Sequence, residues 1–269
     1  MDIEEAVKKG YEIIEFEKKR CPHCQQEYKY KGIESFRKPG LISIINHYPC
    51  ECPGAVKERE DKKRQEEEYK KQEEEYRIRR MLKESRLGVR FLDRTFETFK
   101  VNKENELAFN ICYEYANNLT EKGLYITGNY GTGKTHLAAA IVHVLVRNNI
   151  KCIFGNLSSL FGRIRATYGS YSRETEEEIM NDYIKTPLLI IDDIGKEKCT
   201  EWVLQQLYSV INARYEDYKP IVFTSNFTIK QLENKLTIDG ESSTAEAITS
   251  RLHEMCQGVV LNGTDYRKK

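Results

Sequence analysis

Eight residues decide the fold expected of this chain: Gly128-Asn129-Tyr130-Gly131-Thr132-Gly133-Lys134-Thr135. A short apolar run, residues 124–127, comes directly before them, and an Ala-rich apolar run begins directly after them. This order predicts a strand, a glycine-rich loop and a helix, in which backbone N–H groups and the helix N-terminus converge on phosphates. We therefore expect a nucleoside-triphosphate site, with Lys134 on the β and γ phosphates and the Thr135 hydroxyl on Mg²⁺. A glycine turn that matches by chance is the weaker alternative, because both flanks fit.

Residues 187–191 form a second motif, a continuous apolar run that ends in Asp192 and Asp193. A buried parallel strand delivers a carboxylate at its C-terminal edge, beside the phosphate loop. We expect Asp192 to hold Mg²⁺, directly or through water, and Asp193 to orient or deprotonate the attacking water. An ordinary strand-end turn is the alternative interpretation.

A third apolar run, residues 220–225, ends in small polar groups and is followed by Asn226. Asn226 is a candidate to hydrogen-bond the γ-phosphate or the attacking water, although such a strand end is more often a capped turn. Strand-like and helix-like patterns alternate around these motifs, which predicts an α/β fold with a parallel sheet covered on both faces. The expected strands are 124–127, 152–156, 188–192, 220–225 and 258–261, and the expected helices are 105–118, 134–148, 157–167, 174–184, 202–215 and 244–255.

Four cysteines cluster near the N-terminus: Cys21 and Cys24 form a C-x2-C pair, and Cys50 and Cys52 form a C-x-C pair. Four thiolates at this spacing can close a tetrahedral Zn²⁺ site that replaces a hydrophobic core in a small unit. Because C-x-C is the less usual half, a histidine is a possible substitute for one thiolate, and unliganded or redox cysteines are a third alternative. The candidate histidines are His23 and His47. The other cysteines, Cys112, Cys152, Cys199 and Cys256, are scattered singly and are expected to be free thiols.

Residues 57–86 contain 12 basic and 10 acidic residues and few large apolar ones. Such a stretch cannot bury a core, and its acid-before-base pairs at four-residue spacing favour a solvated linker helix. A helix that is merely a charged spacer is favoured over one that binds a partner.

The whole chain has 269 residues, long enough for one sizeable α/β domain and a small accessory unit. Its formal charge is +1, from 43 basic and 42 acidic residues, so any contact with nucleic acid must be local. The sequence start lacks the pattern of a signal peptide, and no apolar run is long enough to span a bilayer. We therefore expect a soluble, cytoplasmic protein.

The motifs together resemble one group of ATPases. Residues 128–138, 191–195, 224–226 and 248–252 are similar to the corresponding motifs of the AAA+ ATPases of the DnaC/DnaI/IstB group, and the match covers about residues 86–262. Residues 90–99 resemble the segment that leads into the ATPase core of these proteins and helps to enclose the base. The resemblance implies a three-layer αβα P-loop core, a nucleotide site that includes His136, Phe91 and Phe96, and three parts of the chain. These are a zinc-binding helicase-interaction domain (1–56), a charged helical linker (57–86) and the ATPase domain (87–269).

Members of this group assemble so that each active site is completed by a neighbour. Arg251 matches their arginine finger, which would reach the γ-phosphate of the adjoining subunit, and a surface arginine in an ion pair is the alternative. Arg214 is a weaker candidate for a second interface arginine. Two features depart from the broader AAA+ pattern: Asp193 replaces the usual glutamate, so slow hydrolysis is expected, and too few residues follow the last strand for a C-terminal lid domain.

The resemblance also implies that the protein acts on a helicase and binds single-stranded DNA. Loaders of this group hold single-stranded DNA, and the corresponding positions here are Tyr168, Thr200 and Trp202, types that suit stacking on bases and bonding to phosphates. A role of Trp202 as a helix anchor is nearly as well favoured. Nearby basic residues are candidates to neutralise phosphates: Arg163, Arg165, Arg173, Lys196 and Lys198. We expect an ATP-dependent loader of a hexameric DnaB-type replicative helicase, using ATP, Mg²⁺ and Zn²⁺. An IstB-like transposition helper and a nucleotide-gated adaptor with negligible hydrolysis are the alternatives.

Overall fold

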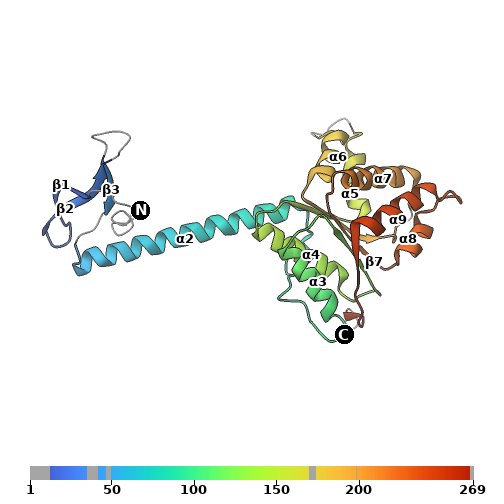
Figure 1. The fold of residues 1–269 in the computed structure, drawn as a ribbon, viewed down its shortest axis with the longest axis horizontal. Helices are drawn as coiled ribbons and strands as arrows, with labels where there is room; N and C mark the ends of the chain where they lie inside the picture. Colours follow the sequence, from blue (N-terminus) through green and yellow to red (C-terminus); the bar gives the residue numbers. More distant parts are fainter. Residues whose placement is uncertain (1–12, 35–41, 47–49, 170–173, 198, 267–269) are drawn as a thin grey trace. The chain divides into compact units, whose positions relative to one another are not determined.

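A computed structural model describes residues 13–34, 42–46, 50–169, 174–197 and 199–266 of the chain (Figure 1). The chain divides into two compact units, residues 1–75 and residues 76–269. Each unit has its own sheet.

The first unit contains a three-stranded antiparallel sheet in the order β1-β2-β3. The strands are β1 (Ile13–Arg20), β2 (Glu27–Glu34) and β3 (Ile42–Asn46). The C-x2-C pair lies in the turn between β1 and β2, where the amide of Cys21 donates to the carbonyl of Gln26 at 2.9 Å. The buried apolar residues described in this unit are only Cys21, Cys50 and Ala55.

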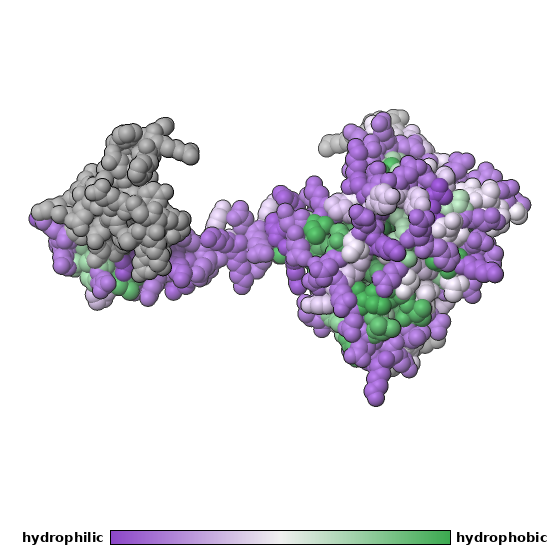
Figure 2. All heavy atoms as spheres, viewed as in Figure 1, coloured by the Kyte–Doolittle hydropathy of each residue, from purple (hydrophilic) through white to green (hydrophobic). Residues whose placement is uncertain are grey.

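Helix α2 (Pro53–Glu84) is the charged helix expected from the sequence. Its surface is almost entirely hydrophilic (Figure 2), and Tyr69 and Tyr76 are exposed on it. Ion pairs along it join Asp61 to Arg64 at 2.6 Å, Lys63 to Glu67 at 3.9 Å and Arg80 to Glu84 at 3.7 Å. Two of these pairs place the base first. The last turns of α2 make apolar contacts, since Met81 is buried in the core of the second unit.

The second unit is built on a five-stranded sheet in the order β5-β6-β7-β4-β8, with all neighbours parallel. The strands are β4 (Gly123–Thr127), β5 (Cys152–Gly155), β6 (Leu188–Ile194), β7 (Ile221–Ser225) and β8 (Cys256–Val260). All five expected strands are confirmed. Strand β6 continues past the two aspartates, because an irregularity between Ile191 and Ile194 carries the chain back into register with Ser225 of β7.

Helices cover both faces of this sheet, which gives the expected three layers (Figure 1). Helices α3 (Glu106–Asn117) and α4 (Lys134–Arg147) pack on one face, with alternate strand residues such as Leu124 and Ile190. The opposite face, with Tyr125 and Ile191, is covered by α5 (Leu157–Ala166), α6 (Glu176–Lys185), α7 (Glu201–Glu216), α8 (Ile229–Leu236) and α9 (Ser243–Met255). Successive residues of a strand point to opposite faces, so each continuous apolar strand supplies both layers.

Helix α8 was not expected from the sequence. Thr228 and Gln231 form a capping box at its start, a signal that the eight-residue length makes easy to overlook. No helix in the described residues is both long enough and apolar enough to cross a membrane.

Candidate functional site

The glycine-rich loop joins β4 to α4, at the carboxyl edge of the sheet. Gly131 and Gly133 have φ angles of 73° and 104°, which favour glycine over residues with a Cβ atom. A Cβ atom at Gly133 would also lie 2.8 Å from the Phe99 ring. The loop geometry therefore depends on glycine at both positions, and it leaves the N-terminus of α4 open toward a phosphate.

Lys134 is 7% exposed, and its ammonium group lies among oxygen acceptors at this edge. The Nζ atom donates to the carbonyls of Gly128 (2.8 Å) and Asn129 (2.7 Å) and to Oδ1 of Asn226 (2.7 Å). Anionic phosphate oxygens are stronger acceptors for an ammonium than these neutral oxygens. The arrangement therefore suits an exchange of these contacts for a triphosphate.

Asp192 receives two hydroxyl groups on one carboxylate oxygen. Thr135 donates to Oδ1 at 2.9 Å and Thr224 donates to the same atom at 2.6 Å. Burial raises the pKa of Asp192, and the two threonine hydrogen bonds oppose that rise. A threonine hydroxyl beside a carboxylate is a donor set that Mg²⁺ favours, so these residues fit the expected metal site.

Asp193 turns away from the strand into the left-handed region, with φ at 56°. Its amide donates to the Thr224 hydroxyl at 2.8 Å, and its Oδ1 accepts from the Asn226 side chain at 2.7 Å. Lys196 lies 3.1 Å from its other oxygen. Asn226 thus bonds both Lys134 and Asp193, which joins the phosphate loop to the two-aspartate strand. The contact of Lys196 with Asp193 could not be predicted from the sequence, because the turn that makes it depends on the backbone angle at Asp193.

A cavity of about 910 Å³ opens over the loop, and its lining includes Lys134, Thr135, Asp192, Asp193 and Asn226. The described lining includes Phe91, as expected, and it also includes Phe99, Thr98 and Tyr266. Phe96 is not part of it, which corrects the sequence expectation. Its ring is 5% exposed and packs edge-on against Phe109 and Tyr113. Two phenylalanines three residues apart look alike in sequence, and the turn from residue 95 to residue 99 decides which one faces the cavity.

His136 closes the same side of the cavity as Phe99. Its Nε2 lies 2.8 Å from the Thr95 carbonyl, and its ring meets Phe99 edge-on with centroids 5.1 Å apart. Burial lowers the pKa of His136, against the effect of the Thr95 carbonyl. A neutral imidazole is therefore favoured at this position.

Arg251 lies on α9, outside the described lining of this cavity. Its guanidinium lies over the rings of Tyr208 (5.1 Å) and Tyr215 (5.5 Å), and Nη1 donates to the Ala247 carbonyl at 3.0 Å. Its Nε is buried without a hydrogen-bond partner in the described part of the chain. The contacts described for this half-buried guanidinium are to aromatic rings, a tyrosine hydroxyl and a backbone carbonyl.

Arg214 is not an interface residue, which corrects the second arginine assignment. It is 0% exposed and donates to the carbonyls of Tyr183, Ile184, Thr186, Pro187 and Pro220, at 2.6 to 3.3 Å. Burial lowers its pKa to about 10. This arginine ties the end of α6 and the start of β6 to the start of β7, and its role is structural.

The residues expected to meet DNA lie near one another. The rings of Tyr168 and Trp202 meet edge-on with centroids 6.4 Å apart, and the Arg165 guanidinium lies 4.7 Å from the Trp202 ring centroid. Thr200 caps α7 and accepts from the amide of Val203. Among the expected cations, Arg163 is paired with Glu174 and Asp182, and Lys196 is paired with Asp193. Arg173 and Lys198 lie outside the described residues.

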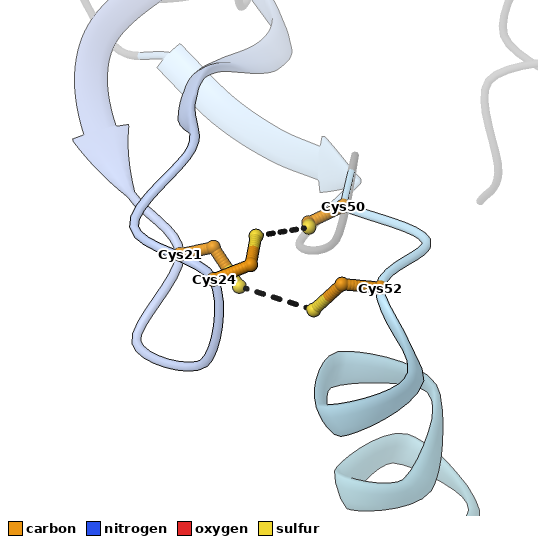
Figure 3. A group of neighbouring side chains, drawn as sticks. All are labelled: Cys21, Cys24, Cys50 and Cys52. Atoms are coloured by element: carbon orange, nitrogen blue, oxygen red, sulfur yellow. Dashed lines mark hydrogen bonds between the residues drawn. The ribbon is translucent and has the colours of Figure 1, made fainter.

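The four clustered cysteines converge in the first unit, with sulfur atoms all within 4.8 Å of one another (Figure 3). Cys24 and Cys50 are 3.4 Å apart, and Cys21 and Cys52 are 3.7 Å apart. Tetrahedral zinc with bonds of about 2.3 Å requires sulfur separations of about 3.8 Å, so the cluster fits this metal. Burial raises the pKa of Cys21, but amide hydrogen bonds from Cys24 and His23 lower it to about 6. An amide hydrogen bond from Cys52 lowers the pKa of Cys50, but its contact with the Cys24 sulfur and its burial raise it to about 12.

The histidine alternatives are placed differently. Nε2 of His23 lies 2.7 Å from a carboxylate oxygen of Glu58, and His23 is not part of the group of ligand atoms. His47 lies outside the described residues.

The sheet order, the phosphate loop and the two-aspartate strand together define a P-loop nucleoside triphosphatase of the AAA+ class. The chain belongs to the family of IstB-like ATP binding proteins, whose family model matches residues 58–269. It is similar to the replicative helicase loader DnaI of Bacillus subtilis (strain 168), with 28% identity over 263 residues, covering 94% of this chain and 78% of that protein.

Two further comparisons agree with the class. The replicative helicase loader DnaC of Buchnera aphidicola subsp. Baizongia pistaciae is 25% identical over 160 residues, covering 58% of this chain and 65% of that protein. A crystal structure of DnaI shares the fold, with a TM-score of 0.56 and 24% identity, over 66% of this chain and 93% of that chain.

Proposed function

We propose that this protein is an ATP-dependent loader that places a hexameric DnaB-type replicative helicase on single-stranded DNA during replication initiation in the cytoplasm. The observation that carries the proposal is the extent of the similarity to DnaI, which covers 94% of the chain. That extent takes in the cysteine cluster as well as the ATPase core. In this proposal residues 1–56 bind Zn²⁺ and grip the helicase, residues 57–86 form the linker, and residues 87–269 bind ATP.

The site supports hydrolysis of ATP by residues with distinct roles. Lys134 and the loop amides would hold the phosphates, and Thr135 and Asp192 would hold Mg²⁺, which would supply charge neutralisation. Asp193 accepts the proton of the attacking water, and Asn226 orients that water and the γ-phosphate. Because Asp193 is one methylene shorter than glutamate and is paired with both Asn226 and Lys196, we propose that turnover is slow.

The same proposal assigns Arg251 to the neighbouring subunit's site. Its place on α9, outside the described lining of the cavity in its own chain, supports a role in trans. Self-association would then bring one guanidinium to each γ-phosphate, so that ATP is hydrolysed only when the subunits have assembled.

Single-stranded DNA would lie across Tyr168 and Trp202, and the Thr200 region at the start of α7 would meet the backbone. Tyr168 is 61% exposed, and Arg165 is placed to neutralise a phosphate beside the Trp202 ring. Trp202 is the only tryptophan of the chain, so its intrinsic fluorescence reports this surface directly. Titration with an unstructured oligonucleotide should quench it, and Tyr168→Ala should weaken that binding while Tyr218→Ala, at another exposed tyrosine, should not.

The deciding experiment is retention of the host replicative helicase by the full-length protein, with and without ATP. Cys24→Ser should release the helicase, and Cys256→Ser should retain it, because Cys256 lies outside the cluster. Loading is then measured as helicase unwinding of a circular single-stranded template. Identical retention of the helicase by the two variants would contradict the assignment of helicase binding to residues 1–56.

A transposition helper is the second candidate, because the matching family is described as IstB-like. Such a protein would retain a transposase and bind duplex DNA, and the absence of helicase binding together with transposase binding would favour it. A third candidate is a nucleotide-gated adaptor without turnover. Phosphate release no higher than that of Lys134→Ala, with DNA present, would favour that candidate.

A further inference from the structure

The chain continues beyond the last strand and follows the phosphate loop. The amide of Leu261 donates to the Thr127 carbonyl at 2.7 Å, and the amide of Tyr266 donates to the Gly131 carbonyl at 3.1 Å. The approach is close at both points, because a Cβ atom at Gly128 would overlap the Leu261 carbonyl and one at Gly131 would overlap the Asp265 carboxylate. Residues 261–266 therefore form a strap against the loop, and we call this segment the C-terminal strap.

Tyr266 is fixed at both ends. Its backbone is bound to Gly131, and its hydroxyl accepts a hydrogen bond from Nδ2 of Asn102 at 2.8 Å. Asn102 is itself oriented, since its Oδ1 accepts from the amides of Glu104 (2.9 Å) and Asn105 (3.1 Å). A ring held in this way loses little conformational entropy when a ligand packs on it.

The cavity lining contains two chemically different sets of groups. Lys134, Asp192 and Asn226 suit the terminal phosphates and a metal. Tyr266, Phe99 and His136 line the same cavity, and their rings suit packing on the ribose and base of a nucleotide.

We infer that Tyr266 is a nucleotide-binding residue, which packs on the nucleoside part of ATP and covers part of the base. Because every base has a π face, this contact raises affinity for the nucleoside without selecting the base. The inference rests on the proposed role of the site in binding ATP, and it is independent of helicase loading.

The test separates the nucleoside from the phosphates. Binding of non-hydrolysable ATP and GTP analogues and of inorganic tripolyphosphate, each with Mg²⁺, is measured by calorimetry on the full chain. Tyr266→Ala should weaken both nucleotides about tenfold, as expected for one lost aromatic stack, and leave tripolyphosphate unchanged. Tyr266→Phe should bind almost as the wild type, because it keeps the ring. Tyr69→Ala, at an exposed tyrosine on α2, is the matched control.

Three results would contradict the assignment of Tyr266 to nucleotide binding. Equal weakening of nucleotide and tripolyphosphate by Tyr266→Ala would overturn the inference, because the strap would then act by shaping the phosphate loop. Unchanged nucleotide binding would overturn it as well. If Tyr266→Ala does not fold, a chain that ends at Asp265 is measured in the same way, since the core is complete at Leu261. A wild-type chain that binds no nucleotide would instead contradict the proposed function, and the inference would fail with it.

Discussion

The cysteine unit (residues 1–75) and the nucleotide unit (residues 76–269) differ in the groups that their described residues bring together. In the cysteine unit the described apolar burial is limited to Cys21, Cys50 and Ala55, and four sulfur atoms converge on one point. In the nucleotide unit two apolar layers cover the two faces of a parallel sheet. We expect the cysteine unit to depend on a bound metal and the nucleotide unit to depend on hydrophobic burial. The two units should therefore respond separately to metal, mutation and acid.

Zinc removal should have the largest effect of the changes considered. It tests whether the cysteine unit, unlike the nucleotide unit, depends on a metal for its stability. Structural zinc contributes on the order of 10 kcal/mol to small domains, so a strong chelator should unfold the cysteine unit completely. Amide hydrogen exchange read by mass spectrometry should lose protection over β1 and β2 and keep it over β4 and β6.

Metal analysis of fresh protein should give about one zinc per chain. Cys24→Ser should reproduce the effect of the chelator, and Cys256→Ser should not. Unchanged protection of β1 and β2 after verified zinc removal would show that this unit has another source of stability.

Loss of the finger arginine should affect the nucleotide unit without affecting its fold. Arg251→Ala should lower ATP hydrolysis about 1,000-fold, or about 4 kcal/mol of transition-state stabilisation, while ATP affinity and melting temperature stay near those of the wild type. Arg147→Ala, at an exposed arginine paired with Glu97, is the control.

Oligomers that contain two different variants test whether Arg251 acts in the site of a neighbouring subunit. Subunits with Arg251→Ala and subunits with Lys134→Ala are each inactive, but mixed oligomers should recover part of the activity, because a finger from one meets a phosphate loop from the other. No recovery in oligomers of verified mixed composition would place Arg251 in its own chain's site.

Arg214 tests how far the nucleotide unit depends on a polar interior. Arg214→Met should destabilise this unit by about 3 kcal/mol, because it leaves several buried carbonyls without a donor. Urea denaturation of the nucleotide unit measures the change, and Arg147→Met at an exposed site should shift it by less than about 0.5 kcal/mol. A shift as small as that of the control would show that water replaces the guanidinium.

A fall in pH should have the smallest effect, and it should change the stability of the two units over different pH ranges. Burial lowers the pKa of His136 and His143, although the Thr95 and Phe91 carbonyls raise them. The stability that these neutral histidines contribute is fully present above their unfolded pKa of about 6.5 and is lost as the pH falls through the lowered values.

The slope of nucleotide-unit stability between pH 7 and pH 5 should therefore be smaller in His143→Gln than in the wild type. His253→Gln, at an exposed histidine, should leave it unchanged. The cysteine unit should lose zinc over a separate range, since protons compete with zinc for thiolates. An identical slope in His143→Gln and the wild type would remove His143 from this effect.

Much of the nucleotide unit was predictable, because its motifs are local. The strand, loop and helix around Lys134 are contiguous, and the apolar run before Asp192 is long enough to be read as a buried strand. Helix α8 was missed because it is short and has a single capping signal. Phe96 was assigned to the cavity in place of Phe99, and Arg214 to an interface in place of the interior, because exposure is not encoded by residue type.

The sequence by itself determined the class of fold, the phosphate loop, the two-aspartate strand, the charged helix and the cysteine spacing, since each depends on neighbours within a few residues. Tertiary structure alone decided which groups meet across distance. It brought Asn226 between Lys134 and Asp193, buried Arg214 against five carbonyls, and laid Tyr266 against Gly131. The physical reason is that a parallel sheet gathers the ends of distant strands at one edge, and no local pattern records which side chains arrive there together.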